Sequence, residues 1–129
     1  MNDRLQHIPP LLPIYALREQ VMFPHMVFPL FIQPDEMPLI EEAMRSDHLL
    51  GLVMCSSNHV PLTFQDLAKV GTVCRINQVF RFPEGGCKVV VEGIKRIRLI
   101  IATQMSPYIV AKVNVTEEQD SGGTAFKRG

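Results

Sequence analysis

Apolar residues crowd together between Leu12 and Ile32, yet three prolines interrupt this run and forbid a continuous helix. Proline lacks the N–H donor that a helix or a central strand requires, so within sheets it is confined to edges, bulges and turns. The run therefore predicts two short strands joined by a bend at Phe23, Pro24 and His25. Because neighbouring strand residues face opposite sides, some of these apolar side chains are expected on the surface.

A helix is predicted after Pro34, with Asp35 as its N-cap and Pro38 in its first turn, where a missing N–H does no harm. Its apolar and charged residues take opposite sides, so the helix is expected to pack on a sheet. The predicted packing residues are Met37, Ile40, Ala43 and Met44. The next segment, Leu49 to Cys55, is continuously apolar and predicts a strand buried on both faces.

Ser56 to Pro61 is predicted to be a loop, followed by a helical turn within Thr63 to Ala68 that Thr63 and Asp66 would cap. A long strand is predicted from Thr72, because apolar and polar residues alternate there. Its predicted inner side chains are Cys74, Ile76, Phe80 and Phe82, and its predicted outer side chains are Arg75, Asn77 and Arg81.

Pro83 to Gly86 has the composition of a tight turn, since glycines supply the positive φ that a reversal demands. The return strand begins at Cys87, and Gly93 predicts a bulge that redirects Lys95, Arg96 and Arg98. A last strand, with Ile109, Ala111, Val113 and Val115 inside, completes the sheet. We therefore expect one domain over residues 1–116 and a polar linker or disordered tail over residues 117–129.

The composition is that of an ordinary globular protein: 129 residues, 47% hydrophobic and 20% charged, with a formal net charge of zero. The charge is unevenly distributed along the chain. Residues 1–70 carry eight acidic against four basic side chains, whereas residues 71–98 carry six basic against two acidic ones. Solvated strand faces account for this asymmetry, and steering of an acidic partner is the alternative interpretation.

Three cysteines, Cys55, Cys74 and Cys87, lie in apolar runs without metal-binding spacing, which predicts small core residues in a reducing compartment. The four histidines are scattered, so no metal site is predicted. The first residues lack the apolar stretch of a signal peptide, and no run reaches the roughly 18 apolar residues of a membrane helix. We expect a cytoplasmic protein that makes no contact with membranes.

Catalytic motifs are absent from the sequence. It contains neither the GxxxxGK[ST] loop that holds ATP phosphates nor the GxSxG turn of a serine hydrolase. Glu41 and Glu42 are adjacent on the predicted helix and point apart, which makes them a poor acid and base pair. The chain by itself is therefore predicted to be no enzyme and to require no cofactor.

The predicted order of elements is typical of a mostly β (α+β) domain, a barrel-like sheet of about six strands with one main α-helix. Two blocks of residues, in the same order and with compatible spacing, also resemble the N-terminal, substrate-binding domain of the ATP-dependent protease Lon. The first block comprises Leu12, Pro13, Leu17, Arg18, Phe23, Pro24, His25, Met26, Pro29, Leu30 and Phe31. The second comprises Gly71, Thr72, Val73, Pro83, Gly85, Val91, Glu92, Gly93 and Arg96.

The resemblance implies a PUA-like pseudobarrel that forms the non-catalytic front end of a hexameric protease and helps to choose and engage unfolded substrates. It implies that ATP hydrolysis and peptide cleavage belong to other regions of a full-length Lon chain, with the other Lon subunits as partners. Two places depart from the family pattern. Gln33, Pro34 and Asp35 replace a glycine-arginine stretch before the helix, and the loop over residues 56–61 lacks its usual acidic character.

Unfolded proteins expose apolar segments, so a surface that recognises them requires adaptable apolar side chains. The candidate substrate-binding residues are Met22, Phe23, Pro24, His25, Met26 and Phe28. Methionine suits this role because it is unbranched and polarizable. Burial in the barrel core is the alternative interpretation for Phe23, Phe28 and Phe31, and both interpretations stay open for Met22 and Met26.

Two other functions are compatible with the predicted fold. A free-standing Lon-like domain would act as a protein-binding adaptor. In either case an uncovered edge strand would allow the isolated domain to form a weak homodimer. Alternatively, a secondary basic surface would bind RNA, and its candidate residues are Arg75, Arg81, Lys88, Arg96 and Arg98. The zero net charge, and the expectation that no exposed aromatic side chain lies among these bases, argue against nucleic acid as a partner.

Overall fold

The computed structural model describes residues 8–18, 24–56 and 62–116. Within these ranges, six strands form one sheet and one α-helix, α2, spans Met37–Arg45. The strands are β1 (Leu11–Leu17), β2 (Val27–Ile32), β3 (Leu49–Cys55), β4 (Leu67–Arg81), β5 (Cys87–Gln104) and β6 (Ile109–Val115), and two 3₁₀ turns are η1 (Pro34–Glu36) and η2 (Phe64–Asp66). The predicted mostly β fold with one main helix is confirmed.

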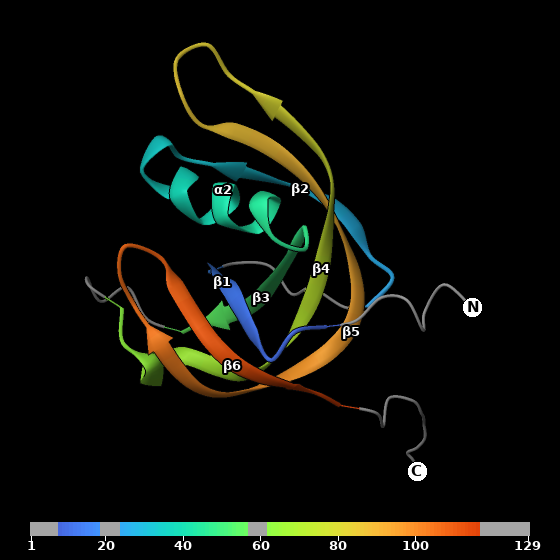
Figure 1. The fold of residues 1–129 in the computed structure, drawn as a ribbon, viewed down its shortest axis with the longest axis vertical. Coiled ribbons are helices and arrows are strands. Elements are labelled where there is room, and N and C mark those ends of the chain that lie inside the picture. Colours follow the sequence, from blue (N-terminus) through green and yellow to red (C-terminus); the bar gives the residue numbers. More distant parts are fainter. Residues whose placement is uncertain (1–7, 19–23, 57–61, 117–129) are drawn as a thin grey trace.

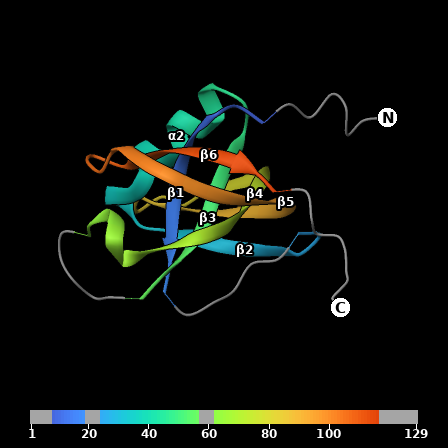
Figure 2. The same ribbon diagram turned by 90° about the horizontal axis from the view of Figure 1, so that it is seen from below.

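The sheet curls into a barrel that leaves β2 outside the ring (Figure 1). The strand order is β2-β5-β4-β3-β1-β6, and β5 also pairs with β6, so β1, β3, β4, β5 and β6 close on one another. The first half of β5 pairs with β2 and its second half pairs with β6. Seen from below, β5 and β6 cross β1, as expected for a strongly curled sheet (Figure 2). Among the described residues, β2 pairs with β5 alone, so its other edge is unpaired.

Two clusters of buried side chains lie on opposite faces of β3. Leu49 and Val53 point into the closed barrel, while Leu50 and Leu52 point toward α2. We call these clusters the barrel core and the helix-side core. The prediction that residues 49–55 form a strand buried on both faces is confirmed, and β3 is the wall that both cores share.

The apolar face of α2 packs on the helix-side core. Ile40 and Ala43 are fully buried and Leu39 nearly so, while Met37 and Met44 are half-buried at the margin of the same cluster. The predicted packing of the helix on the sheet is therefore confirmed, with Leu39 added to the predicted residues.

The start of the helix differs from the prediction. The turn η1 precedes it, and the Gln33 backbone N–H donates a hydrogen bond to the Glu36 carboxylate at 2.9 Å. That bond belongs to η1, whereas α2 begins at Met37 with Glu36 as its N-cap residue, so the assignment of Asp35 as N-cap is wrong. Pro38 lies in the first turn, as predicted.

β4 begins at Leu67 rather than at the predicted Thr72, directly after the turn that Thr63 and Asp66 cap. The Thr63 backbone N–H donates to the Asp66 carboxylate at 2.8 Å, so the predicted capping pair is confirmed. Lysine and glycine are depleted in strands, and the early part of β4 contains both. Gly71 is required there, because a Cβ would lie 2.4 Å from the Leu52 carbonyl oxygen of β3.

A β-bulge at Asn77 reverses the predicted alternation of β4. Ile76 pairs with Val91 and Gln78 with Val90, so Asn77 is an extra residue in the register and later side chains change faces. The prediction that Phe80 and Phe82 point inward is therefore wrong: their side chains are 45% and 37% exposed.

The remaining predictions for the hairpin and the last strand are confirmed. Gly85 and Gly86 have φ values of 110° and 78° in the turn, where a side chain would be strained. A register shift at Ile94 follows Gly93, and β6 buries Ile109, Ala111 and Val113, while Val115 is half-buried against the barrel core. Residues 57–61 of the loop predicted over Ser56 to Pro61, and the predicted tail over residues 117–129, lie outside the described residues.

Candidate functional site

Three adjacent strands, β2, β5 and β4, present one face to solvent at the hairpin end of the molecule. Its side chains stand in three cross-strand rows, defined by the register of the sheet. We call this surface the outer sheet face, and its rows are Phe31–Lys88–Phe80, Pro29–Val90–Gln78 and Val27–Glu92–Arg75.

The outer sheet face is unusually apolar for a solvated surface. Val27 and Phe31 are 57% and 60% exposed, and Met26, directly before β2, is 36% exposed. Single exposed apolar residues are common, whereas neighbouring ones that form a continuous patch mark an interaction surface. Val27, Phe31 and Phe80 belong to one face, so they are not apolar residues scattered singly over the surface.

The backbone of Pro29 faces the unpaired edge of β2. The Gly93 backbone N–H donates to the Met26 carbonyl oxygen at 2.8 Å, so the backbone groups of even-numbered β2 residues face β5. Those of Val27, Pro29 and Phe31 consequently face the open edge. Pro29 has no N–H to offer there, which reduces the capacity of this edge to add another strand.

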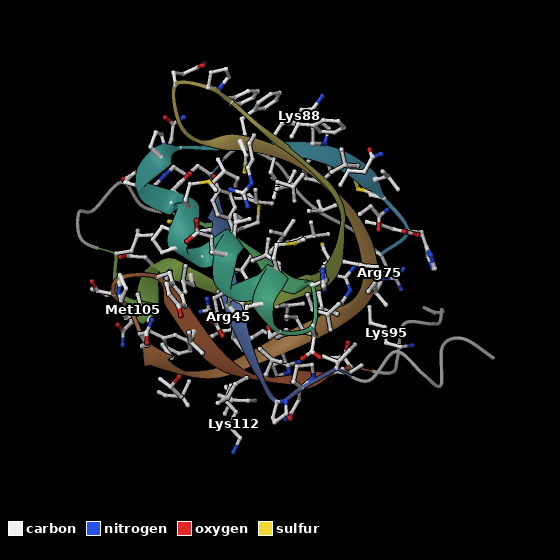
Figure 3. The ribbon with its side chains drawn as sticks, turned by 45° about the horizontal axis from the view of Figure 1, so that its top comes forward. Arg45, Arg75, Lys88, Lys95, Met105 and Lys112 are labelled. Atoms are coloured by element: carbon white, nitrogen blue, oxygen red, sulfur yellow. The ribbon has the colours of Figure 1, made fainter. Side chains whose placement is uncertain are left out.

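Lys88 stands between the two phenylalanines of the first row. Its Nζ lies 4.9 Å from the centroid of the Phe80 ring, a cation–π distance, and it projects from the outside of the sheet (Figure 3). Among residues 8–18, 24–56 and 62–116, no carboxylate forms an ion pair with Lys88. The Lys88 ammonium therefore faces solvent while it rests against the Phe80 ring.

The charged residues of the third row, Glu92 and Arg75, form an ion pair with each other. The Glu92 carboxylate lies 4.0 Å from the Arg75 guanidinium and accepts a hydrogen bond from the Asn77 side-chain amide at 3.2 Å. Arg75 and Asn77 thus hold Glu92 at the far side of the outer sheet face. The bulge that exposes Asn77 also creates this contact.

The structure describes four of the six candidate residues at the bend, and Met22 and Phe23 lie outside the described residues. Pro24 is half-buried, and His25 is exposed with a φ of 76°. Met26 is exposed, whereas Phe28 is half-buried and packs on the helix-side core.

The five candidate basic residues do not form one surface. Arg75 and Lys88 share the outer sheet face, but Arg81 pairs with the buried Cys87 and so belongs to the opposite face. Arg96 and Arg98 lie beyond the Gly93 bulge, where β5 has turned toward β6. The expectation that no exposed aromatic lies among these bases is also wrong, because Phe80 stacks beside Lys88.

Sequence reasoning missed Val27, Phe31 and Phe80 as surface residues. Core burial, the alternative interpretation for Phe31, is wrong for this residue. The signal was present in part, since Pro29 on a strand edge implies that Val27 and Phe31, two residues away on either side, share its face. The exposure of Phe80 depends on the bulge at Asn77, which alternation alone does not reveal.

A groove of about 840 Å³ lies between β2 and the second half of β1, beside α2. Its apolar walls include Tyr15, Leu17, Phe28, Leu30, Leu39 and Tyr108. The Tyr15 hydroxyl donates a hydrogen bond to the Glu36 carboxylate at 3.4 Å. Burial, together with the negative charge of Glu36, raises the pKa of Tyr15 to about 12, so the phenol is neutral at physiological pH.

The described residues contain no group of three or more histidine, cysteine or acidic side chains placed to hold a metal ion. Cys55, Cys74 and Cys87 are buried free thiols, and burial raises the pKa of Cys74 to about 12. A neutral, buried thiol is unreactive, in line with the predicted role as small core residues. None of the described helices is both long and apolar enough to cross a membrane.

The fold agrees with the comparison to known proteins. Residues 11–128 match the family model of the ATP-dependent protease La (LON) substrate-binding domain. The chain therefore belongs to the family of Lon substrate-binding domains, and the predicted resemblance is confirmed.

Among its relatives are Lon proteases from two bacteria. The chain is 35% identical over 112 residues to the Lon protease of Citrifermentans bemidjiense and 36% identical over 118 residues to that of Dictyoglomus thermophilum. These alignments cover 87% and 91% of this chain but only 14% and 15% of the two relatives. The chain thus spans about one seventh of the length of these proteases.

A solved structure with the same fold is the N-terminal domain of a Mycobacterium avium complex Lon protease, with a TM-score of 0.68 and 19% identity. That alignment covers 87% of this chain and 57% of the other. The Lon N-terminal domain protein from Xanthomonas campestris gives a TM-score of 0.65 at 19% identity, over 83% of this chain and 60% of the other. At this identity the likeness concerns the fold alone.

Proposed function

We propose that this chain binds exposed apolar segments of unfolded or damaged proteins on behalf of an ATP-dependent Lon protease, without catalysing a reaction itself. The observation that carries the proposal is the outer sheet face, where Val27, Phe31 and Phe80 stay exposed on paired strands. Folded proteins bury such side chains, so a surface of this kind distinguishes unfolded polypeptides by the apolar groups that they expose.

The proposed contact surface begins at the bend and continues along β2. Its members at the bend are the predicted residues Met22, Phe23, Pro24, His25, Met26 and Phe28. Met26 is exposed directly before β2, and the exposed Val27 follows it, which supports continuity between the bend and the outer sheet face. Met26 contributes a flexible side chain, and the strand holds Val27 and Phe31 in fixed positions.

The rest of the activity belongs to regions that this chain does not cover. We assign ATP hydrolysis and peptide cleavage to the remainder of a full-length Lon, and we take that remainder and the other Lon subunits as partners of this domain. Three buried free thiols are compatible with the reducing cytoplasm that the sequence predicts.

Binding of a permanently unfolded client tests the proposal directly. Fluorescence anisotropy of a labelled, reduced and carboxymethylated model protein is expected to show binding by the unmodified chain and at least tenfold weaker binding by Phe31→Asp. Ile101→Asp is the matched control, because Ile101 is 51% exposed on the opposite half of β5. Equal binding by the unmodified chain and a folded Phe31→Asp variant would reject this surface as the client site.

Single-stranded RNA is a second candidate ligand, favoured by one observation: the Phe80 ring lies against the Lys88 ammonium. The charge on the outer sheet face favours protein instead, because Glu92 offsets Arg75 and leaves Lys88 as the unbalanced cation. Binding of an RNA oligonucleotide that weakens steeply with salt would support the second candidate.

A further inference from the structure

We propose that the row Phe31–Lys88–Phe80 selects polypeptide segments in which a carboxylate is flanked by apolar side chains. This inference rests on the proposed function, and it adds the chemistry of the preferred client. An unselective apolar surface would accept any exposed hydrophobic segment, whereas a lysine fixed between two rings adds a charge requirement to the same contact.

The register fixes the spacing of the three side chains. Phe31 pairs with Lys88 and Lys88 pairs with Phe80, so all three point outward from adjacent strands. Adjacent strands lie about 4.8 Å apart, which places the two ring positions roughly 10 Å apart with the lysine midway. An extended segment that rests on both rings therefore passes over the ammonium.

The lysine lacks an anion of its own in the described part of the chain. The Lys88 Nζ contacts the Phe80 ring, and no described carboxylate pairs with it. Glu92 lies four residues along β5, about 13 Å away on an extended strand, and it is engaged by Arg75 and Asn77. A bound segment is therefore the source of the complementary charge, and the apolar contacts on either side exclude water and strengthen that ion pair.

Charge also favours a peptide over a nucleic acid on this row. A phosphate backbone presents one charge per nucleotide and requires several cations along its path. Here Arg81 lies on the opposite face, while Arg75 is neutralised by Glu92, whose carboxylate would repel phosphate. One isolated lysine between two rings matches one carboxylate between two apolar side chains.

A second row supplies a matched control within the same chain. Leu11 of β1 pairs with Lys112 of β6, and Lys112 pairs with Ile101 of β5, so a lysine again stands between two exposed apolar residues. Neither neighbour is aromatic. A charge reversal at Lys112 therefore changes the net charge of the chain by the same amount without touching the proposed row.

The test uses three fluorescein-labelled twelve-residue peptides that are identical and apolar except for one central residue, which is Glu, Gln or Lys. Anisotropy titration of the unmodified chain is expected to give the tightest binding to the Glu peptide. The expected loss is about threefold with Gln and roughly tenfold with Lys, as for a partly exposed ion pair and its reversal. Lys88→Glu is expected to invert this order, and Lys88→Met to abolish it while retaining apolar contact. Lys112→Glu is expected to preserve the order.

The outcomes separate this inference from the proposed function. If the unmodified chain binds all three peptides equally, the charge selection is wrong and the apolar binding surface stands. If it binds none of them, both proposals fail. Inversion of the order by Lys112→Glu as well as by Lys88→Glu would also overturn the inference, because net charge rather than the row would then set the preference. Circular dichroism melting curves establish that each variant is folded.

Discussion

Lys88 and Lys112 stand in the same arrangement at two ends of one molecule, each between two exposed apolar residues on adjacent strands. The surroundings differ. Lys88 has phenylalanines on both sides and its ammonium contacts one ring, and the next row adds Pro29 and Val90 to the apolar surface. Lys112 has aliphatic neighbours, and the rows on either side of it are Arg98–Asn114 and Pro13–Val110–Gln104, in which Pro13 is buried.

Exposed apolar residues stand at both ends of the molecule, so their number alone does not distinguish the two ends. At the barrel end, Leu11 and Ile101 are 49% and 51% exposed, nearly as much as Val27 and Phe31. Two properties distinguish the hairpin end: Val27, Pro29 and Phe31 are all exposed along the edge strand β2, and aromatic rings flank Lys88 on both sides. At the barrel end, Pro13 lies on the same face as Leu11 but is buried, and neither neighbour of Lys112 is aromatic. Substitutions that remove either property should reduce the difference in peptide binding between the two ends.

The largest effect is expected where β2 is anchored. Leu30 is buried in the helix-side core, so Leu30→Ala should lower the free energy of unfolding by about 2–5 kcal/mol. Val27→Ala, on the outer face of the same strand, should change it by less than about 0.5 kcal/mol. Urea unfolding of both variants checks this expectation, and equal losses would contradict the assignment of one buried and one exposed face to β2.

A smaller effect is expected from pH on the helix side of the molecule. The folded chain holds the pKa of Tyr15 near 12 against an ordinary value of 10. The neutral phenol therefore contributes fully to the free energy of unfolding below pH 10, and this contribution is lost as the pH rises through 12. Because the phenol is partly exposed, the loss should be only about 1 kcal/mol. Urea unfolding between pH 8 and pH 12 should show a shallower decline for Tyr15→Phe than for the unmodified chain, and identical declines would refute the assignment.

A comparable effect on binding is expected from the ring beneath Lys88. Phe80→Ala should weaken binding of the Glu-containing peptide about threefold, because it removes one apolar contact and the cation–π support. Ile101→Ala, which shortens an apolar side chain in the second row, should leave that affinity unchanged. Anisotropy titration of the two variants provides the measurement, and similar losses would mean that the two rows are equivalent.

The smallest effect is expected at the open edge of β2. Pro29→Ala adds a backbone N–H that faces this edge, so the variant should self-associate more than the unmodified chain by strand pairing. Sedimentation velocity at increasing protein concentration detects the change. A variant that stays as monomeric as the unmodified chain would show that Pro29 does not protect the edge.

Local rules predicted most elements because each rests on a pattern confined to a few residues. The continuous apolar run of β3, the glycines of the β4–β5 turn and the capping pair Thr63–Asp66 are examples. Family resemblance then supplied the fold. The start of β4 was missed because Gly71 satisfies a tertiary requirement, the close approach of the Leu52 carbonyl, that no local pattern expresses.

The site was less predictable because it depends on register. One extra residue at Asn77 decides that Phe80 shares the outer sheet face with Lys88, while the exposed Arg81 lies on the opposite face with Cys87. The apolar bend and the basic residues were recognised separately in the sequence. Apolar residues of β2 and the basic residue Lys88 of β5 share one face because β2 pairs with β5. This long-range contact is not specified by the alternation within a single strand.

Photocrosslinking tests the central claim most directly. The photoreactive residue p-benzoylphenylalanine is placed at position 31 in one variant and at position 101 in another, and each is irradiated with an unfolded, acidic and aromatic-rich client. We predict efficient crosslinks from position 31, competed by the Glu-containing peptide, and only background from position 101. Equal crosslinking from both positions, or a stronger signal from position 101, would contradict the claim that the outer sheet face is where clients bind.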